Sequence, residues 1–141
     1  MLRDGGSGDW IGTFAGHKGA VWSAKLNASA TRCGTGSADF SARVWDACSG
    51  EVLGDFGHGH IVKSVDFSLS GRRFFTGGNE GKLRLFDLSG ASTPRSTDAA
   101  LALSLGSKIR RVVALPGDED AVLVGCEDGG LRVVDVRKGG V

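Results

Sequence analysis

The stretch that decides the fold is GHKGAVWSAKLNASATRCGTGSADFSARVWD, residues 16–46. It begins with the pair Gly16-His17 and ends with the pair Trp45-Asp46. Between these pairs lie two short runs that alternate apolar with small or polar residues, interrupted by turn-forming Asn, Ser, Asp and Gly. The stretch therefore predicts short antiparallel strands joined by tight turns.

The same pattern returns twice along the chain. At an offset of 41 residues, His17 meets His58 and Trp45 meets Phe86 without any gap. A more decayed copy ends at Val134, 48 residues after Phe86. Several independent positions agree at both offsets, so the stretch is an internal repeat.

A period of about 40–45 residues with Gly-His and Trp-Asp ends indicates WD40 repeats, each a four-stranded blade of a β-propeller. The expected fold class is all-β: a partial WD40 propeller with two full repeats and two partial ones. The predicted units are residues 1–14 (the end of a preceding blade), 16–56 (repeat 1), 57–105 (repeat 2) and 106–141 (a degenerate, incomplete repeat 3). Because propellers close with about 4–8 blades, we expect the remaining blades to be missing from these 141 residues.

Composition narrows the function classes. A net charge of +1 gives no general attraction for nucleic acid, and no apolar run approaches the ~20 residues of a membrane span. The three cysteines, Cys33, Cys48 and Cys126, show no CxxC spacing, which favours free thiols in a reducing compartment. We therefore expect a cytoplasmic protein without a cofactor or metal, with a nuclear location also open.

The first repeat is predicted to carry a structural hydrogen-bond network. Its members are His17, Ser37, Asp39 and Trp45. An indole N–H only donates, a hydroxyl donates and accepts, a neutral imidazole does both, and a carboxylate accepts. A chain through these four groups would link the strands of the blade, each link contributing ~1 kcal/mol.

The later repeats are expected to have lost this network. The second repeat keeps a histidine but has Gly78, Glu80 and Phe86 at the other three positions. The third keeps only Asp128, and Val134 replaces the tryptophan. Glu80 is accordingly expected to be a more solvated turn residue than its counterpart in the first repeat.

Two constellations resemble catalytic or metal sites. His17, Ser37 and Asp39 are the residue types of a hydrolase triad, but the repeat already accounts for each, and Ser37 lies in no G-x-S-x-G elbow. His58 and His60 are close in sequence, yet His58 is also explained by the repeat. We expect no catalytic, cofactor-binding or metal-binding residues and a protein that is not an enzyme.

Several arginines and one tryptophan have a structural and a functional interpretation. Arg110-Arg111 could contact a phosphate, although a solvated strand face is the simpler interpretation. Trp22 is expected to pack within the blade rather than to bind a ligand. Arginines recur at one position of each repeat, and their stems are expected to cover apolar surface while their charged heads reach water: Arg43, Arg84 and Arg132.

Three motifs carry a resemblance to one family. They are DWIGTF at residues 9–14, GHKGAVW at 16–22 and HIVK at 60–63. Together they resemble the serine-threonine kinase receptor-associated proteins, also called unr-interacting proteins, over roughly residues 8–88. The i subunit of initiation factor three is also similar around residues 16–22 and 36–39, but HIVK favours the first family.

The resemblance implies a non-catalytic scaffold whose partners are other proteins. In that family the partners are Gemin components of the survival-of-motor-neuron complex, which assembles spliceosomal small ribonucleoproteins, and components of TGF-β receptor signalling. No binding residue is carried over, because none of the three motifs is a partner-contact motif. The alternatives are a translation-factor propeller and a generic WD40 adaptor.

Overall fold

A computed structural model describes residues 1–88 and 99–137. Across these residues the chain forms thirteen β-strands and no helix, so the described part contains no helical membrane span. The all-β prediction is confirmed.

Two sheets of four strands and one of three follow one another along the chain. Blade 1 contains β3 (Val21–Leu26), β4 (Arg32–Ser37), β5 (Ser41–Asp46) and β6 (Val52–Gly57). Blade 2 contains β7 (Val62–Phe67), β8 (Arg73–Gly78), β9 (Lys82–Asp87) and β10 (Leu101–Ser104). Blade 3 contains β11 (Ile109–Ala114), β12 (Ala121–Cys126) and β13 (Leu131–Asp135). Each strand pairs antiparallel with the next, as in a propeller blade.

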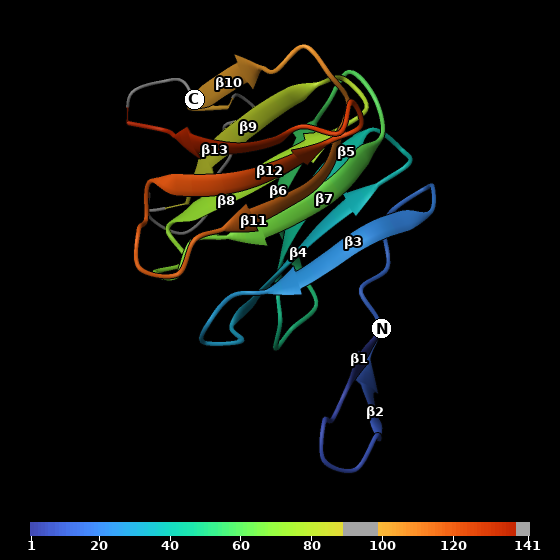
Figure 1. Cartoon of the computed structure of the whole chain (residues 1–141). Coiled ribbons are helices and arrows are strands. Elements are labelled where there is room, and N and C mark those ends of the chain that lie inside the picture. Colours follow the sequence, from blue (N-terminus) through green and yellow to red (C-terminus); the bar gives the residue numbers. More distant parts are fainter. Residues whose placement is uncertain (89–98, 138–141) are drawn as a thin grey trace.

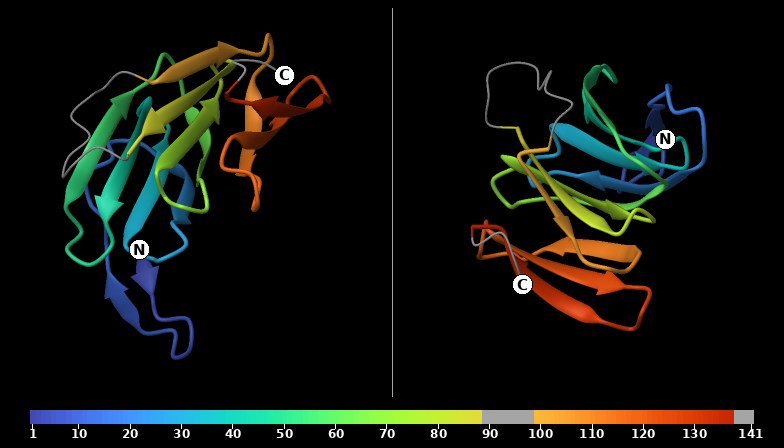
Figure 2. Two further views of the ribbon diagram at one scale, coloured as in Figure 1. Left: turned by 90° about the vertical axis from the view of Figure 1, so that its left-hand side faces the viewer. Right: turned by 90° about the horizontal axis from the view of Figure 1, so that it is seen from above.

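The blades lie face to face in chain order, and the series is not closed into a ring (Figures 1 and 2). The first strand of each blade lies beside the first strand of the next, β3 against β7 and β7 against β11. A short hairpin of β1 (Leu2–Arg3) and β2 (Trp10–Gly12) projects from blade 1 (Figure 1).

The structural repeat follows the sequence repeat in detail. The pairing of β3 with β4 contains a β-bulge between Val21 and Ser23, and β7 with β8 has one between Val62 and Ser64. Blade 3 has its bulge just after Ile109. The bulge recurs at the start of the first strand because the 41-residue offset preserves the register, and it re-aims the residue that it contains.

Apolar side chains fill the two spaces between blades. The core between blades 1 and 2 consists of Ala42, Val44, Phe56, Val62, Val65, Phe67, Phe74, Phe86 and Leu88. The core between blades 2 and 3 consists of Phe75, Leu83, Leu85, Ile109, Val112, Val122, Val124, Cys126 and Val134. The neighbours Phe74 and Phe75 point to opposite faces of β8, as successive residues of a strand do, so blade 2 is covered on both sides.

Glycine in the second strand allows this close approach. A Cβ placed on Gly34 would lie 2.4 Å from the ring of Phe74, and one on Gly77 would lie 2.6 Å from Ile109. These distances are shorter than any side chain tolerates. The small residues of the second strand thus set the spacing between blades.

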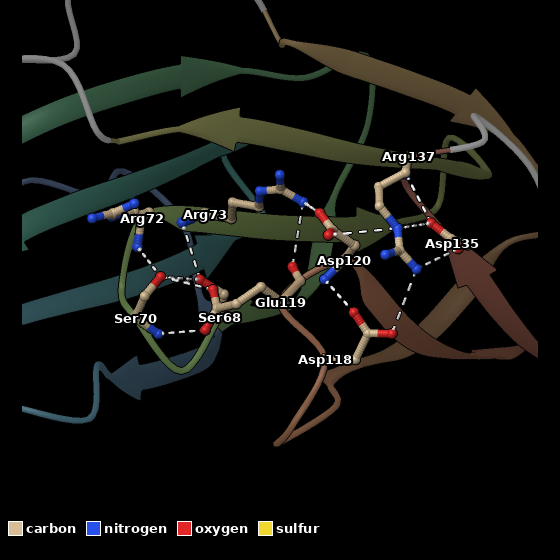
Figure 3. Close-up of polar contacts among 9 residues, drawn as sticks. All are labelled: Ser68, Ser70, Arg72, Arg73, Asp118, Glu119, Asp120, Asp135 and Arg137. Atoms are coloured by element: carbon tan, nitrogen blue, oxygen red, sulfur yellow. Dashed lines mark hydrogen bonds and ion pairs between the residues drawn. The ribbon is translucent and has the colours of Figure 1, made fainter.

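Polar contacts cross between blades 2 and 3 at one edge (Figure 3). The side chain and backbone N–H of Ser70 donate to Glu119, at 2.7 and 2.8 Å, and Arg73 forms an ion pair with Asp120. Arg137, just after β13, approaches the same acidic turn and donates to Asp135 at 2.9 Å (Figure 3). The turns at this edge are held together by charge and hydrogen bonds rather than by apolar burial.

The outer faces of the series are apolar and uncovered. Leu131 and Val133 of β13 are 70% and 52% exposed. Blade 1 borders a cavity of about 260 Å³ lined by residues that include Leu26, Cys33 and Trp45. In a propeller, such faces pack against neighbouring blades.

Candidate functional site

The hydrogen-bond network of blade 1 centres on Thr35 in the middle of β4. The indole N–H of Trp45 donates to Thr35 Oγ1 at 2.9 Å, and His17 Nε2 lies 2.6 Å from the same oxygen. The other ring nitrogen, His17 Nδ1, lies 2.9 Å from Asp39 Oδ2. Thr35 and Trp45 are buried, with 5% and 1% of their surface exposed.

The donors and acceptors of these side chains determine the direction of each hydrogen bond in the network. The carboxylate of Asp39 only accepts, so Nδ1 of His17 carries a proton and donates to it. In the neutral ring Nε2 is then the acceptor, and the hydroxyl of Thr35 donates to it while accepting from Trp45. Each group thus supplies what the next one requires, from the indole to the carboxylate.

Asp39 also organises the turn before β5. It accepts from the backbone N–H of Lys18 at 3.0 Å and from the hydroxyl of Ser41 at 2.6 Å. Burial alone would raise the pKa of Asp39, but the hydrogen bonds from Ser41, His17 and Lys18 outweigh it and hold the pKa well below its ordinary value. The carboxylate is therefore a fixed anion that joins two loops of the blade.

The placement of Ser37 corrects the sequence prediction. Its hydroxyl donates to the carbonyl of Gly19 at 3.2 Å and accepts from the N–H of Asp39 at 3.2 Å. The hydroxyl between indole and imidazole belongs instead to Thr35, two residues earlier on the same face of β4. The prediction that Ser37 links Trp45 to His17 is wrong, because Ser37 lies at the end of the strand, beside the turn.

Blade 2 keeps more of the network than the sequence suggested. His58 Nε2 lies 2.7 Å from Thr76 Oγ1, and Nδ1 donates to the carbonyl of Phe56 at 3.0 Å. Thr76 occupies the position of Thr35 at the 41-residue offset, so Gly78 was the wrong residue to compare. The indole donor is lost, and the carbonyl of Phe56 replaces the carboxylate as the acceptor of the histidine.

Glu80 is not the solvated turn residue that we expected. Its side chain is 12% exposed, the same fraction as that of Asp39. It accepts from Arg84 Nε at 2.6 Å and from the N–H of Gly59 at 3.0 Å. Burial opposes its ionisation, but these hydrogen bonds outweigh burial and keep the pKa of Glu80 below its ordinary value.

The recurring arginines are ion-paired as well as partly exposed. Arg84 pairs with Glu80, and Arg132 pairs with Asp128 at 3.0 Å, four residues apart in each case. Arg43 instead lies 3.3 Å from Asp55 and 5.8 Å from the ring of Trp45. Each charged head is thus partly exposed, as expected, but also pairs with a carboxylate of its own blade, which was not predicted from the sequence.

The histidine pair lacks the geometry of a metal site. Both ring nitrogens of His58 are engaged in hydrogen bonds, whereas His60 is exposed and its Nδ1 accepts from the N–H of Ile61. Within residues 1–88 and 99–137 no three His, Cys, Asp or Glu side chains gather into a metal-binding group. Arg110, for which a phosphate contact was one interpretation, forms an ion pair with Glu127 at 3.0 Å.

Trp22 does not pack inside a blade. It is the residue contained in the β-bulge of β3, and 54% of its surface is exposed. The ammonium of Lys63, the corresponding residue of blade 2, lies 3.4 Å from the centre of its ring. The periodicity of the strand predicted packing, but the bulge turns the side chain out of the sheet.

The blades, their bulges and the Trp–Thr–His–Asp chain define a class of protein, the WD40 β-propellers. Residues 8–46 and 50–87 match the family described as WD domain, G-beta repeat. The chain belongs to this family. The fold is also similar to the crystal structure of the beta-propeller domain of Myceliophteria thermophila Cps50 (Swd1), with a TM-score of 0.74 and 16% identity over 85% of this chain and 37% of that one.

Particular relatives are more similar in sequence. The chain is 58% identical over 89 residues to the serine-threonine kinase receptor-associated protein of Gallus gallus and 56% identical to that of Homo sapiens. Each match covers 63% of this chain and 25% of the relative, so the chain matches about a quarter of the length of these proteins. It is also 30% identical over 140 residues to eukaryotic translation initiation factor 3 subunit I of Culex quinquefasciatus, covering 93% of this chain and 43% of that protein.

Proposed function

We propose that this chain is part of a non-catalytic WD40 scaffold that binds Gemin components of the survival-of-motor-neuron complex during assembly of spliceosomal small ribonucleoproteins. The observation that supports it is the identity of 56–58% over 89 residues with serine-threonine kinase receptor-associated proteins. The motif DWIGTF contains β2 of the N-terminal hairpin, and HIVK lies at the start of blade 2. Where TGF-β receptors exist, the same resemblance supports a role in their signalling.

The geometry of blade 1 supports a scaffold rather than an enzyme. Both nitrogens of His17 are engaged, and the hydroxyl nearest to the ring belongs to buried Thr35. A hydrolase needs a nucleophile that substrate can reach and a base free to take its proton. Here the polar groups hold strands together, which leaves the blade edges for contacts with other proteins. We propose a cytoplasmic and also nuclear location, with neither nucleic acid nor membrane as a direct partner.

A second candidate is the i subunit of initiation factor three. The similarity to that subunit runs through 93% of this chain, including blade 3, whereas the first resemblance covers 63%. Identity is lower, at 30%. A translation-factor propeller would bind different partners through the same architecture.

Affinity purification of the tagged full chain, followed by mass spectrometry, tests the proposal. We expect Gemin components to be recovered in proportion to the bait. A matched sample of the initiation factor three i subunit from the same cells serves as the control. Recovery of the core of initiation factor three with this chain, without Gemin components, would instead favour the second candidate.

A further inference from the structure

Phe40 lies in a backbone conformation that disfavours a large side chain. Its φ is 68°, in the left-handed region. The two later repeats have glycine at the same position, Gly81 with φ of 73° and Gly129 with φ of 85°. Glycine is the usual residue there because it has no Cβ to clash with the backbone. An aromatic residue in the first repeat alone calls for a reason.

Packing does not supply that reason. Phe40 is 44% exposed and belongs to neither interblade core. Its ring lies 5.2 Å from the ring of His60, which is itself exposed. Strain that the fold does not compensate through burial is concentrated at binding sites in proteins.

A second exposed ring lies on the same side of blade 1. Trp22 projects from the bulge of β3 toward Lys63 of blade 2, just as Phe40 contacts His60 of blade 2. All four residues belong to the end of the blades where β3 and β7 begin and β4 ends. We call these residues, Trp22, Phe40, His60 and Lys63, the seam surface, since both contacts cross from blade 1 to blade 2.

At this end of the blades the carboxylates have ion-pair partners, whereas several lysines do not. Its carboxylates pair with cationic groups of their own blades: Asp39 with His17, Asp55 with Arg43, Glu80 with Arg84, Glu127 with Arg110 and Asp128 with Arg132. Over the part of the chain that the structure describes, four lysines at this end form no ion pair: Lys18, Lys63, Lys82 and Lys108. Lys18 precedes the loop that Asp39 anchors beside Phe40. The charge left available to a partner is therefore positive.

We propose that the seam surface binds an acidic linear segment of a partner protein. A large apolar side chain of that segment packs on Phe40 and Trp22, and its carboxylates lie against Lys18 and Lys63. Exposed aromatic residues beside cations are typical anchors of protein interfaces. Single-stranded nucleic acid fits less well, because it needs a continuous basic groove, and this end of the blades also carries the carboxylates of Asp39 and Glu80. The inference holds whichever complex the protein belongs to.

Fluorescence anisotropy with the full chain tests this surface. The probe is a labelled synthetic peptide with a central tryptophan flanked by glutamates, and the matched probe has glutamine at every glutamate. We expect the acidic peptide to bind more tightly than the glutamine peptide. Phe40→Gly should weaken its binding about tenfold, and Lys63→Gln should weaken it less and reduce its salt dependence. Leu69→Ser, an exposed apolar residue at the opposite end of blade 2, is the control that should leave binding unchanged.

Phe40→Gly separates binding from folding. Glycine adopts the left-handed conformation without strain, so the thermal midpoint should stay level or rise while affinity falls. The proposal is overturned by an acidic peptide that does not bind, by equal binding of the two peptides, or by undiminished binding to Phe40→Gly. A fall in the thermal midpoint of Phe40→Gly would show that Phe40 serves the fold instead. Displacement of the peptide by oligouridylate would assign the surface to nucleic acid.

Discussion

Replacing Thr35 with valine removes one oxygen from the centre of the blade 1 network. Valine has a similar shape, so the packing of β4 changes little. The change leaves the indole N–H of Trp45 without an acceptor and Nε2 of His17 without a donor. Both groups are largely buried, with 6% of the His17 side chain and 1% of Trp45 exposed.

The structure sets the size of the effect. Each buried polar group without a partner costs about 1–3 kcal/mol, so two such groups predict a loss of about 2–6 kcal/mol for Thr35→Val. Thr76→Val in blade 2 leaves only Nε2 of His58 unpaired, since no indole is present there. Its predicted loss is about 1–3 kcal/mol.

Urea unfolding of the full chain, followed by tryptophan fluorescence, measures both losses. The slope of free energy against denaturant should be the same in all variants, which shows that the same transition is compared. Ser37→Ala is the matched control, because Ser37 contacts only backbone groups at the strand end. It should cost about 1 kcal/mol. A larger loss for Ser37→Ala than for Thr35→Val would refute the assignment of the central hydroxyl.

Two further predictions concern packing and pH. Gly34→Ala should destabilise the chain by about 1–3 kcal/mol in the same urea assay, because the new methyl group would overlap the ring of Phe74. Burial, with the charge of Arg84, lowers the pKa of His58 despite the hydrogen bond to Phe56. The unfolded chain therefore takes up that proton more readily, so stability present above pH of about 6.5 should be lost as the pH falls below it, and His58→Gln should remove this part of the pH dependence.

Each of these two predictions has an outcome that would contradict it. Gly57→Ala is the control for packing, since nothing lies within 4 Å of a Cβ at that position. An equal effect of the two alanines would mean that the blades are not spaced by Gly34. For the titration, a His58→Gln variant with an unchanged pH profile between about 5 and 7 would show that His58 is not the group responsible.

The repeat made the strands predictable, but not every contact between them. The offset of 41 residues placed β3 to β9 because the same turns and apolar positions recur. Thr35 and Ser37 are both small hydroxyl residues on one face of β4, and alternation cannot say which hydroxyl the indole of Trp45 reaches. The pairing of Cys33 with Trp45 settles it, because it brings Thr35 rather than Ser37 within reach of the indole.

Glu80 and Trp22 show two other limits of the sequence. The role of Glu80 depends on Arg84, a partner that lies beside it only when the turn and β9 have formed. Trp22 follows the apolar alternation of its strand, and a one-residue bulge decides where it points. Such bulges come from the pairing of two strands, which composition does not reveal.

The adjacent phenylalanines of β8, Phe74 and Phe75, do not by themselves fix how this strand is aligned with its neighbours. A slip by one residue would exchange Phe74 with Phe75, and an aromatic ring would still face each neighbouring blade. Apolar character therefore hardly distinguishes the two alignments. The distinction rests on two polar contacts of the strand, from Arg73 at its start to Asp120 and from Thr76 in its middle to His58. In β8, hydrophobic residues supply cohesion while charged and hydrogen-bonding residues encode alignment.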